Sequence, residues 1–158
     1  MLPLLGALFL AGMCASRDSV PAAPVTFRTI HQGAYATVGA DMPGLVLVTD
    51  QETYRTVWKT NVGEGTPPPV DFSRESVVFL FGGQRPTGGF SVEPLSTAVA
   101  GDEVTIDVEV HAPAPHSMVT QAITSPFAVI AVPSPILNSA RWRDREGRVV
   151  TDHTRRTR

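Results

Sequence analysis

The chain has 158 residues, 42% hydrophobic and 18% charged, with 14 prolines and 13 glycines, which is the composition of one turn-rich globular domain. Its net charge of −2 hides an asymmetry, because residues 17–135 hold six basic and twelve acidic side chains, whereas residues 136–158 hold seven arginines and three acids. The larger part would repel phosphate groups, so a uniformly basic nucleic-acid binder is excluded.

The first sixteen residues are predicted to be an export segment. An uncharged apolar run over residues 4–13 has the length of a signal-peptide core and is shorter than the roughly 20 residues that span a bilayer. Cys14 follows this run, but Met13 stands where a bacterial lipoprotein cleavage site has a small residue. Three outcomes stay open: lipidation of Cys14, removal of the segment as an ordinary signal, or its burial in the domain. The first two predict an exported protein of the bacterial periplasm or cell envelope, and the first adds a membrane anchor.

After this segment the chain begins with a tether and short extended pieces. Residues 17–24 are polar and rich in alanine and proline, which is typical of a flexible tether. Residues 25–30 and 34–38 have β-like composition, and residues 45–48 predict a compact buried strand.

One helix is predicted, at about residues 50–61. Thr49 and Glu52 have the spacing of a capping box, in which a hydroxyl and a carboxylate satisfy the first free N–H groups. Tyr54, Val57 and Trp58 fall on one face at helical spacing, so we expect this face to dock the helix on a sheet.

The strands that follow carry the clearest patterns. Residues 77–81 are continuously apolar, which predicts a central strand covered on both faces. Residues 103–111 alternate apolar and polar side chains, which predicts one buried and one wet face. Turn residues at 100–102 would pair that strand with residues 90–95 as a hairpin, and residues 127–132 predict another buried strand.

These elements predict a mainly β fold, an antiparallel sheet or sandwich with one packed α-helix. We expect a single β-rich domain over residues 25–135. Residues 136–158 would then be an arginine-rich tail, with a short hairpin that turns near Glu146 and Gly147.

A glycine-rich loop follows the central strand. Gly83 and Gly88 have the spacing of a phosphate-binding loop, but Gly89 and Phe90 stand where lysine and serine or threonine are needed, so we expect no nucleotide. Two interpretations stay open: a tight β-connection in which glycines supply positive φ, or a rigid loop that docks into a partner. The candidate partner-binding residues are Arg85, Pro86, Thr87, Gly88, Gly89 and Phe90.

The sequence shows no recognisable catalytic or metal-binding pattern. His111 and His116 are separated by Ala-Pro-Ala-Pro, which breaks any common register. There is no Gly-x-Ser-x-Gly elbow and no paired-carboxylate frame. We therefore predict no catalytic, cofactor-binding or metal-binding residues, although a hydrolase whose triad assembles only in space stays open as a further hypothesis.

The order of several short pieces resembles one known family. Five pieces, taken in chain order, resemble the PrcB family of protease-complex subunits: residues 70–73, 77–82, 85–90, 104–110 and 124–127. The resemblance spans residues 70–133 and corresponds to the C-terminal domain of that family. Phe90 stands where the family more often has tyrosine. The resemblance implies an exported, often lipid-anchored accessory protein of the kind that stabilises a surface protease complex, and it carries no catalytic residues over.

We therefore predict a non-catalytic exported accessory domain that binds another exported protein, with a protease as the candidate partner. A protease inhibitor is the alternative, because residues 86–90 are similar to a loop of chagasin-type cysteine-protease inhibitors on an immunoglobulin-like sandwich. The two other loop motifs of that group are not evident.

Overall fold

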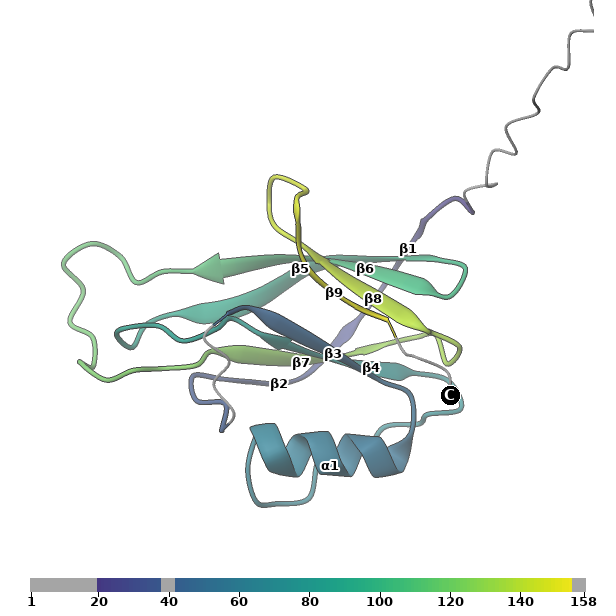
Figure 1. The fold of residues 1–158 in the computed structure, drawn as a ribbon, viewed down its shortest axis with the longest axis horizontal. Helices are drawn as coiled ribbons and strands as arrows, with labels where there is room; N and C mark the ends of the chain where they lie inside the picture. Colours follow the sequence, from purple (N-terminus) through teal and green to yellow (C-terminus); the bar gives the residue numbers. More distant parts are fainter. Residues whose placement is uncertain (1–19, 38–41, 155–158) are drawn as a thin grey trace, which may run out of the picture.

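A computed structural model describes residues 20–37 and 42–154, and in this part of the chain nine strands and one helix form (Figure 1). The predicted mainly β fold with a single helix is confirmed. The export segment 1–16 and Cys14 lie outside the described residues. Among the residues that the structure describes, no helix is long and apolar enough to cross a membrane. The elements are β1 (Ala23–Val25), β2 (Arg28–Gly33), β3 (Gly44–Val48), α1 (Gln51–Asn61), β4 (Ser76–Phe81), β5 (Ser91–Ala100), β6 (Glu103–His111), β7 (Phe127–Val132), β8 (Ser139–Arg143) and β9 (Val149–Thr154).

The strands form two sheets packed face to face, and α1 covers the outer side of one of them (Figure 1). The five-stranded sheet has the order β1-β5-β6-β8-β9, and the four-stranded sheet has the order β2-β7-β4-β3. Neighbouring strands are antiparallel except β6 and β8, which are parallel. One hydrophobic core lies between the sheets, and a second lies between the four-stranded sheet and α1.

The central position of β4 explains its continuous apolar sequence. Val78 and Leu80 point into the core between the sheets, whereas Val77 and Phe79 point into the core beneath α1. All six residues of β4 are buried, and so are all six residues of β7 beside it. The prediction of a strand covered on both faces is therefore confirmed, because a strand in the middle layer of three has no wet side.

The alternating strand and its hairpin are also confirmed. Val104, Ile106 and Val108 of β6 are buried, and the residues between them are partly exposed. β5 and β6 pair as antiparallel neighbours, and Gly101 at φ +60° makes the turn between them.

The helix begins one residue later than its capping pattern suggested. Asp50 is the N-cap, and its carboxylate accepts hydrogen bonds from the Thr53 backbone N–H at 2.8 Å and from the Thr53 hydroxyl at 2.9 Å. The predicted cap at Thr49 is therefore wrong, since a carboxylate one position later reaches the first free N–H groups equally well. Tyr54 and Trp58 are buried against the sheet as expected, with ring centroids 5.9 Å apart in an edge-on arrangement.

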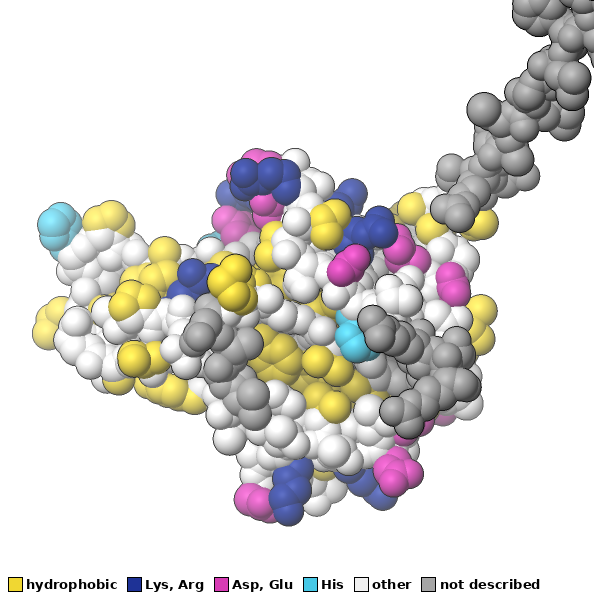
Figure 2. Space-filling view, viewed as in Figure 1, with side chains coloured by type: hydrophobic (Ala, Val, Ile, Leu, Met, Phe, Trp, Pro, Cys, Tyr) yellow, Lys and Arg dark blue, Asp and Glu magenta, His cyan; other side chains and the backbone are white. Residues whose placement is uncertain are grey.

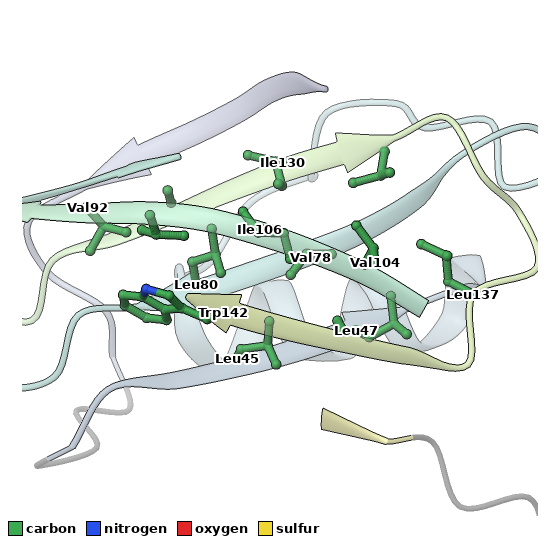
Figure 3. Close-up of a cluster of buried hydrophobic side chains, with 14 residues drawn as sticks. Leu45, Leu47, Val78, Leu80, Val92, Val104, Ile106, Ile130, Leu137 and Trp142 are labelled. Carbon is green, nitrogen blue, oxygen red and sulfur yellow. The ribbon is translucent and has the colours of Figure 1, made fainter. Parts of the chain in front are cut away.

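The C-terminal segment differs from the arginine-rich tail expected after residue 135. The short hairpin forms, with Gly147 at φ +78° in its turn, but its strands β8 and β9 belong to the five-stranded sheet. Leu137, Ala140 and Trp142 are each about 1% exposed and lie in the core between the sheets (Figure 3). The sheet sandwich thus extends to residue 154. At the other end it begins within the expected tether 17–24, because β1 starts at Ala23.

The arginines of this segment have a structural role on the outer face of the sheet. Three of them pair with acidic side chains of β6: Arg141 with Glu103 at 3.0 Å, Arg143 with Asp107 at 2.7 Å, and Arg145 with Glu109 at 3.2 Å. Each pair is partly exposed to solvent, so its contribution to stability is at most about 1 kcal/mol. The charge asymmetry of the sequence is therefore partly neutralised within one sheet.

Substitution of Trp142 tests whether the C-terminal hairpin belongs to the core. We expect Trp142→Ala to lower the free energy of unfolding by about 3–5 kcal/mol, because it removes a buried ring and leaves a cavity. Val149→Ala on the same hairpin is the control, since Val149 is 55% exposed and should change stability by no more than about 0.5 kcal/mol. Urea unfolding followed by circular dichroism measures both. Equal effects of the two substitutions would contradict this packing.

Tyr54 carries the main pKa perturbation of the helix core. Burial raises the pKa of its phenol from 10.0 to about 12, although the charge of Arg28 lowers it in part. The hydroxyl donates a hydrogen bond to the Pro68 carbonyl at 3.2 Å. Both observations describe a phenol that the fold keeps protonated.

The raised pKa of Tyr54 predicts a loss of stability at alkaline pH. Below pH 10 the phenol is protonated in both the folded and the unfolded state, so it contributes no pH dependence there. Between pH 10 and 12 the unfolded state releases this proton while the folded state retains it, so stability falls as pH rises. Urea midpoints measured across that range should fall less steeply in Tyr54→Phe than in the wild type. Parallel curves for the two proteins would refute the assignment.

Candidate functional site

The glycine-rich loop, residues 82–90, lies at one end of the sandwich beside the connection between β6 and β7, residues 112–126 (left end of Figure 1). Arg85 and Thr124 exchange backbone hydrogen bonds at 2.8 and 3.0 Å. The Gly88 N–H donates to the Thr120 carbonyl at 2.8 Å. The Thr124 hydroxyl donates to the Thr87 carbonyl at 2.8 Å. We call the two segments together the paired loops, because these bonds hold them as one unit.

Glycine is required at two points of this arrangement. Gly89 has φ +82°, and a Cβ added there would lie 2.8 Å from Pro113 Cβ and 2.9 Å from Val119 Cγ1. Gly83 also has a positive φ, of +76°. The interpretation of the loop as a β-connection with glycines at positive φ is therefore confirmed at these two positions.

Two of the candidate partner-binding side chains, Arg85 and Phe90, are folded onto each other. The Arg85 guanidinium donates a hydrogen bond to the Gly82 carbonyl at 2.7 Å and lies 5.6 Å from the centroid of the Phe90 ring. Both residues are half-buried, whereas Gln84, Pro86 and Gly89 are exposed. Binding of a partner by the residues from Arg85 to Phe90 stays a prediction, and the geometry makes Pro86 its most accessible side chain.

The paired loops also display large hydrophobic side chains that the sequence predictions did not include. Met118 is fully exposed, and Ile123 is 67% exposed. Tyr35 is 59% exposed. Its neighbour Ala36 donates its backbone N–H to the Ser125 carbonyl, so Tyr35 lies beside this connection. Figure 2 shows hydrophobic side chains gathered over this end of the molecule. In the sequence, the only sign of this surface was that Met118 and Ile123 are large apolar residues in an otherwise polar, proline-containing connection. We call Tyr35, Pro86, Met118 and Ile123 the end surface.

A hollow of about 430 Å³, lined in part by Arg85, lies between β6 and the β8–β9 hairpin. Its apolar walls are Pro43, Val108, Val110, Trp142 and Val150, and its charged walls are Arg85, Glu109, Asp144, Arg145, Glu146 and Arg148. Burial alone would raise the pKa of Asp144, but hydrogen bonds from the Arg148 backbone and side chain outweigh it and lower that pKa. These walls contain no serine, threonine, cysteine or histidine.

The histidines are placed apart from one another. His111 at the end of β6 lies 2.6 Å from the Glu93 carboxylate, while His116 lies in the paired loops at φ +65°. His31 on β2 packs its ring 5.5 Å from that of Trp58. Within residues 20–37 and 42–154 no three His, Cys, Asp or Glu side chains gather closely enough to hold a metal ion.

One family model matches the middle of the chain. Residues 76–133 match the family model described as PrcB C-terminal. In this region the chain is similar to the PrcB C-terminal family. The resemblance predicted over residues 70–133 is thereby confirmed over residues 76–133. Comparisons with curated proteins and with solved structures found no match.

The PrcB C-terminal match runs from the first residue of β4 to just after β7, so it contains both of the paired loops and the strands that carry them. It includes neither α1 nor the β8–β9 hairpin. The family match therefore coincides with the glycine-rich loop and its partner segment, together with the hairpin of β5 and β6.

Replacement of Gly89 tests the close approach of the paired loops. Gly147 is the matched control, because it has nearly the same φ of +78° but would place an added Cβ in open space. We expect Gly147→Ala to cost roughly 1–2 kcal/mol from backbone strain alone. Gly89→Ala should cost at least about 1 kcal/mol more, since its Cβ overlaps Pro113 and Val119. Urea unfolding compares them, and equal losses would contradict the packing of the loops.

Proposed function

We propose that this protein is a non-catalytic, exported accessory domain that binds another protein through the end surface, with a subunit of a protease complex as its partner. The observation that carries the proposal is the rigid pair of loops within the matched PrcB C-terminal region, with exposed hydrophobic side chains at its tip. Apolar side chains exposed together on a small domain are typical of protein-interaction sites.

The rigidity of the loops supports binding without a large entropic cost. Backbone hydrogen bonds join Arg85 to Thr124 and Gly88 to Thr120, and Gly89 packs closely on the facing segment. A surface that is already ordered loses less conformational freedom on association, so more of its contact energy contributes to affinity. Met118 and Ile123 would supply the buried centre of such an interface, with polar neighbours around them.

The position of β1 bears on how the end surface would face a partner if the chain is anchored at Cys14. Ala23 of β1 pairs with Val99, next to the β5–β6 turn, whereas the paired loops join the opposite ends of β5 and β6. A tether leading from a lipidated Cys14 to β1 would therefore hold the end surface away from the membrane. Mass spectrometry of the mature N-terminus tests this part of the proposal, because a diacylated Cys14 and a residue farther along differ in mass.

Two isoleucines provide a matched test of the end surface. Ile123 is 67% exposed on the paired loops, and Ile136 is 69% exposed at the other end of the sandwich, next to the segment that bonds to Asp102. Tagged wild type, Ile123→Ser and Ile136→Ser are used to capture proteins from envelope extracts. The captured protein is then purified and its affinity for each variant is measured directly. We expect Ile123→Ser to weaken binding about tenfold or more, and Ile136→Ser to bind like the wild type.

The identity and behaviour of the captured protein decide the finer claim. A protease subunit whose half-life is lengthened by the wild type, and not by Ile123→Ser, would support an accessory role in a protease complex. Capture that is equal for both isoleucine variants would rule out the end surface. Inhibition of papain-like enzymes by micromolar protein would instead favour the inhibitor alternative, since residues 86–90 lie on a loop at the end of a β-sandwich.

A further inference from the structure

The connection between β6 and β7 holds one long apolar side chain out in solvent between two fixed points (left end of Figure 1). Met118 is fully exposed, and it is the most exposed large hydrophobic residue that the structure describes. Before it, the Ser117 N–H and hydroxyl both donate to the Ala114 carbonyl, at 3.0 and 2.7 Å. After it, the Thr120 carbonyl accepts from the Gly88 N–H at 2.8 Å. The backbone is therefore anchored on both sides of Met118.

The turn that leads to Met118 is strained. His116 has φ +65°, and among the described residues it alone has a positive φ without being glycine. It is the third residue of a β-turn closed by the Ser117 N–H, with Pro115 before it, a place where such turns favour glycine or asparagine. A side chain in this conformation costs roughly 1–2 kcal/mol, and such strain is concentrated at binding and catalytic sites. The strained turn is a second observation that points to a function for this segment.

The backbone at Met118 takes no part in holding the domain together. The Met118 N–H and carbonyl and the Val119 N–H make no hydrogen bond within the described part of the chain. The half-buried side chain of Val119 packs towards the glycine-rich loop, where a Cβ added to Gly89 would lie 2.9 Å from its Cγ1. Residues 112–126 contain no Asp, Glu, Lys or Arg. Residues 117–119 thus offer an outward apolar side chain and free backbone groups, with no charge that a partner would have to desolvate.

The segment has the features that a serine endopeptidase recognises in a polypeptide. Such an enzyme inserts the side chain before the scissile bond into one primary pocket, and the walls of that pocket set which residue is preferred. It also bonds to the backbone of the extended segment on either side. The long, uncharged side chain of Met118 suits an apolar pocket, whereas a pocket built for a cation would be left with an unpaired carboxylate. An ordered segment loses little conformational freedom on binding.

We propose that residues 117–120 form a substrate-like inhibitory segment, which inserts Met118 into the primary pocket of a serine endopeptidase that prefers large apolar residues. The inference rests on the proposed function, because Met118 belongs to the end surface. It goes further by assigning the surface of the partner, which is the substrate cleft of an enzyme.

The fixed flanks explain why such a segment inhibits the enzyme instead of being digested. In the first step the serine oxygen of the enzyme bonds to the Met118 carbonyl carbon, the bond to the Val119 nitrogen breaks, and the serine proton passes to that nitrogen. Val119 and Thr120 stay in place through Gly89 and Gly88, so the new amine remains beside the ester. It then attacks the ester and restores the peptide bond before water does. Turnover is therefore slow, and the cleft stays occupied.

Substitution of Met118 tests this mode of binding, because it should exchange one enzyme for another. The wild type should inhibit chymotrypsin, whose primary pocket is apolar, with an inhibition constant of about 10 µM or lower, and should leave trypsin active. Met118→Lys should weaken inhibition of chymotrypsin about tenfold or more and should inhibit trypsin instead. Met42→Lys should behave like the wild type, since it adds the same charge at a methionine that is 73% exposed and lies outside the paired loops. Hydrolysis of small chromogenic substrates measures each activity.

Removal of one anchor tests the role of rigidity. Ser117→Ala loses its hydroxyl hydrogen bond, so chymotrypsin should cleave the Met118–Val119 bond about threefold faster or more, which corresponds to the loss of one hydrogen bond. Ser96→Ala is the matched control, because its hydroxyl bonds to Asp107 on the five-stranded sheet at 2.6 Å. Mass spectrometry identifies the cleaved bond and follows its rate.

The outcomes separate this inference from the proposed function. Exchange of chymotrypsin for trypsin by Met118→Lys supports the inference, and so does slow cleavage confined to the Met118–Val119 bond. Absence of chymotrypsin inhibition at about 100 µM protein, equal inhibition by Met118→Lys, or rapid cleavage without inhibition would each overturn it. Those results leave the proposed function in place, because capture with Ile123→Ser decides it separately. The titration of chymotrypsin with the wild type is decisive even if a variant fails to fold.

Discussion

The parallel pairing of β8 with β6 is the constraint on which the rest of the molecule depends. It places Ala140 opposite Val104 and Trp142 opposite Ile106, so that the indole enters the core between the two sheets (Figure 3). Before β8 the chain crosses from the four-stranded to the five-stranded sheet, and there the Asn138 side chain donates to the Asp102 carboxylate at 2.9 Å. Without this strand, β6 would be an open edge with an incomplete inner face. The hairpin that follows then forms one wall of the hollow beside Arg85.

The position of the paired loops depends on the two central strands of the four-stranded sheet. The loop after β4 and the connection after β6 meet because β4 and β7 are neighbours in the middle layer, where all their residues are buried. Gly82 shows how closely the segments approach, since an added Cβ there would lie 2.8 Å from Val92 Cγ2 and 3.1 Å from Pro126 Cγ. A continuous apolar core and closely packed glycines therefore produce a stiff end of the sandwich, on which hydrophobic side chains are presented to solvent.

Much of this fold could be predicted from local sequence patterns, but the C-terminal strands could not. β4, β6 and the helix have periodicities that reflect their own burial. β8 has an alternating pattern too, Ser-Ala-Arg-Trp-Arg, but its arginines suggested a solvated tail. Their partners on β6 lie more than thirty residues away in the chain, and a parallel pairing across an intervening strand leaves no local signal. The parallel register of β8 with β6 both buries Trp142 and brings the arginines opposite their acidic partners.

The candidate site was predictable in place but not in detail. The glycine-rich loop was found from composition, and its positive φ angles followed from the residue type. The orientation of Arg85 depends on the Gly82 carbonyl and on Phe90, and the exposure of Met118 and Ile123 depends on a segment without periodicity. Such orientations are set by tertiary contacts that no single segment encodes.

Native-state hydrogen exchange of the β8 amides tests the central claim that the C-terminal hairpin is an integral part of one cooperative domain. If the hairpin is integral, the amides of Ala140 and Trp142 should exchange with the same free energy as those of Val78 and Ile130, which open only in global unfolding. Exchange from β8 at a much lower free energy, while β4 and β7 stay protected, would show that the hairpin opens separately. That result would mean that β8 and β9 are not part of the cooperative core.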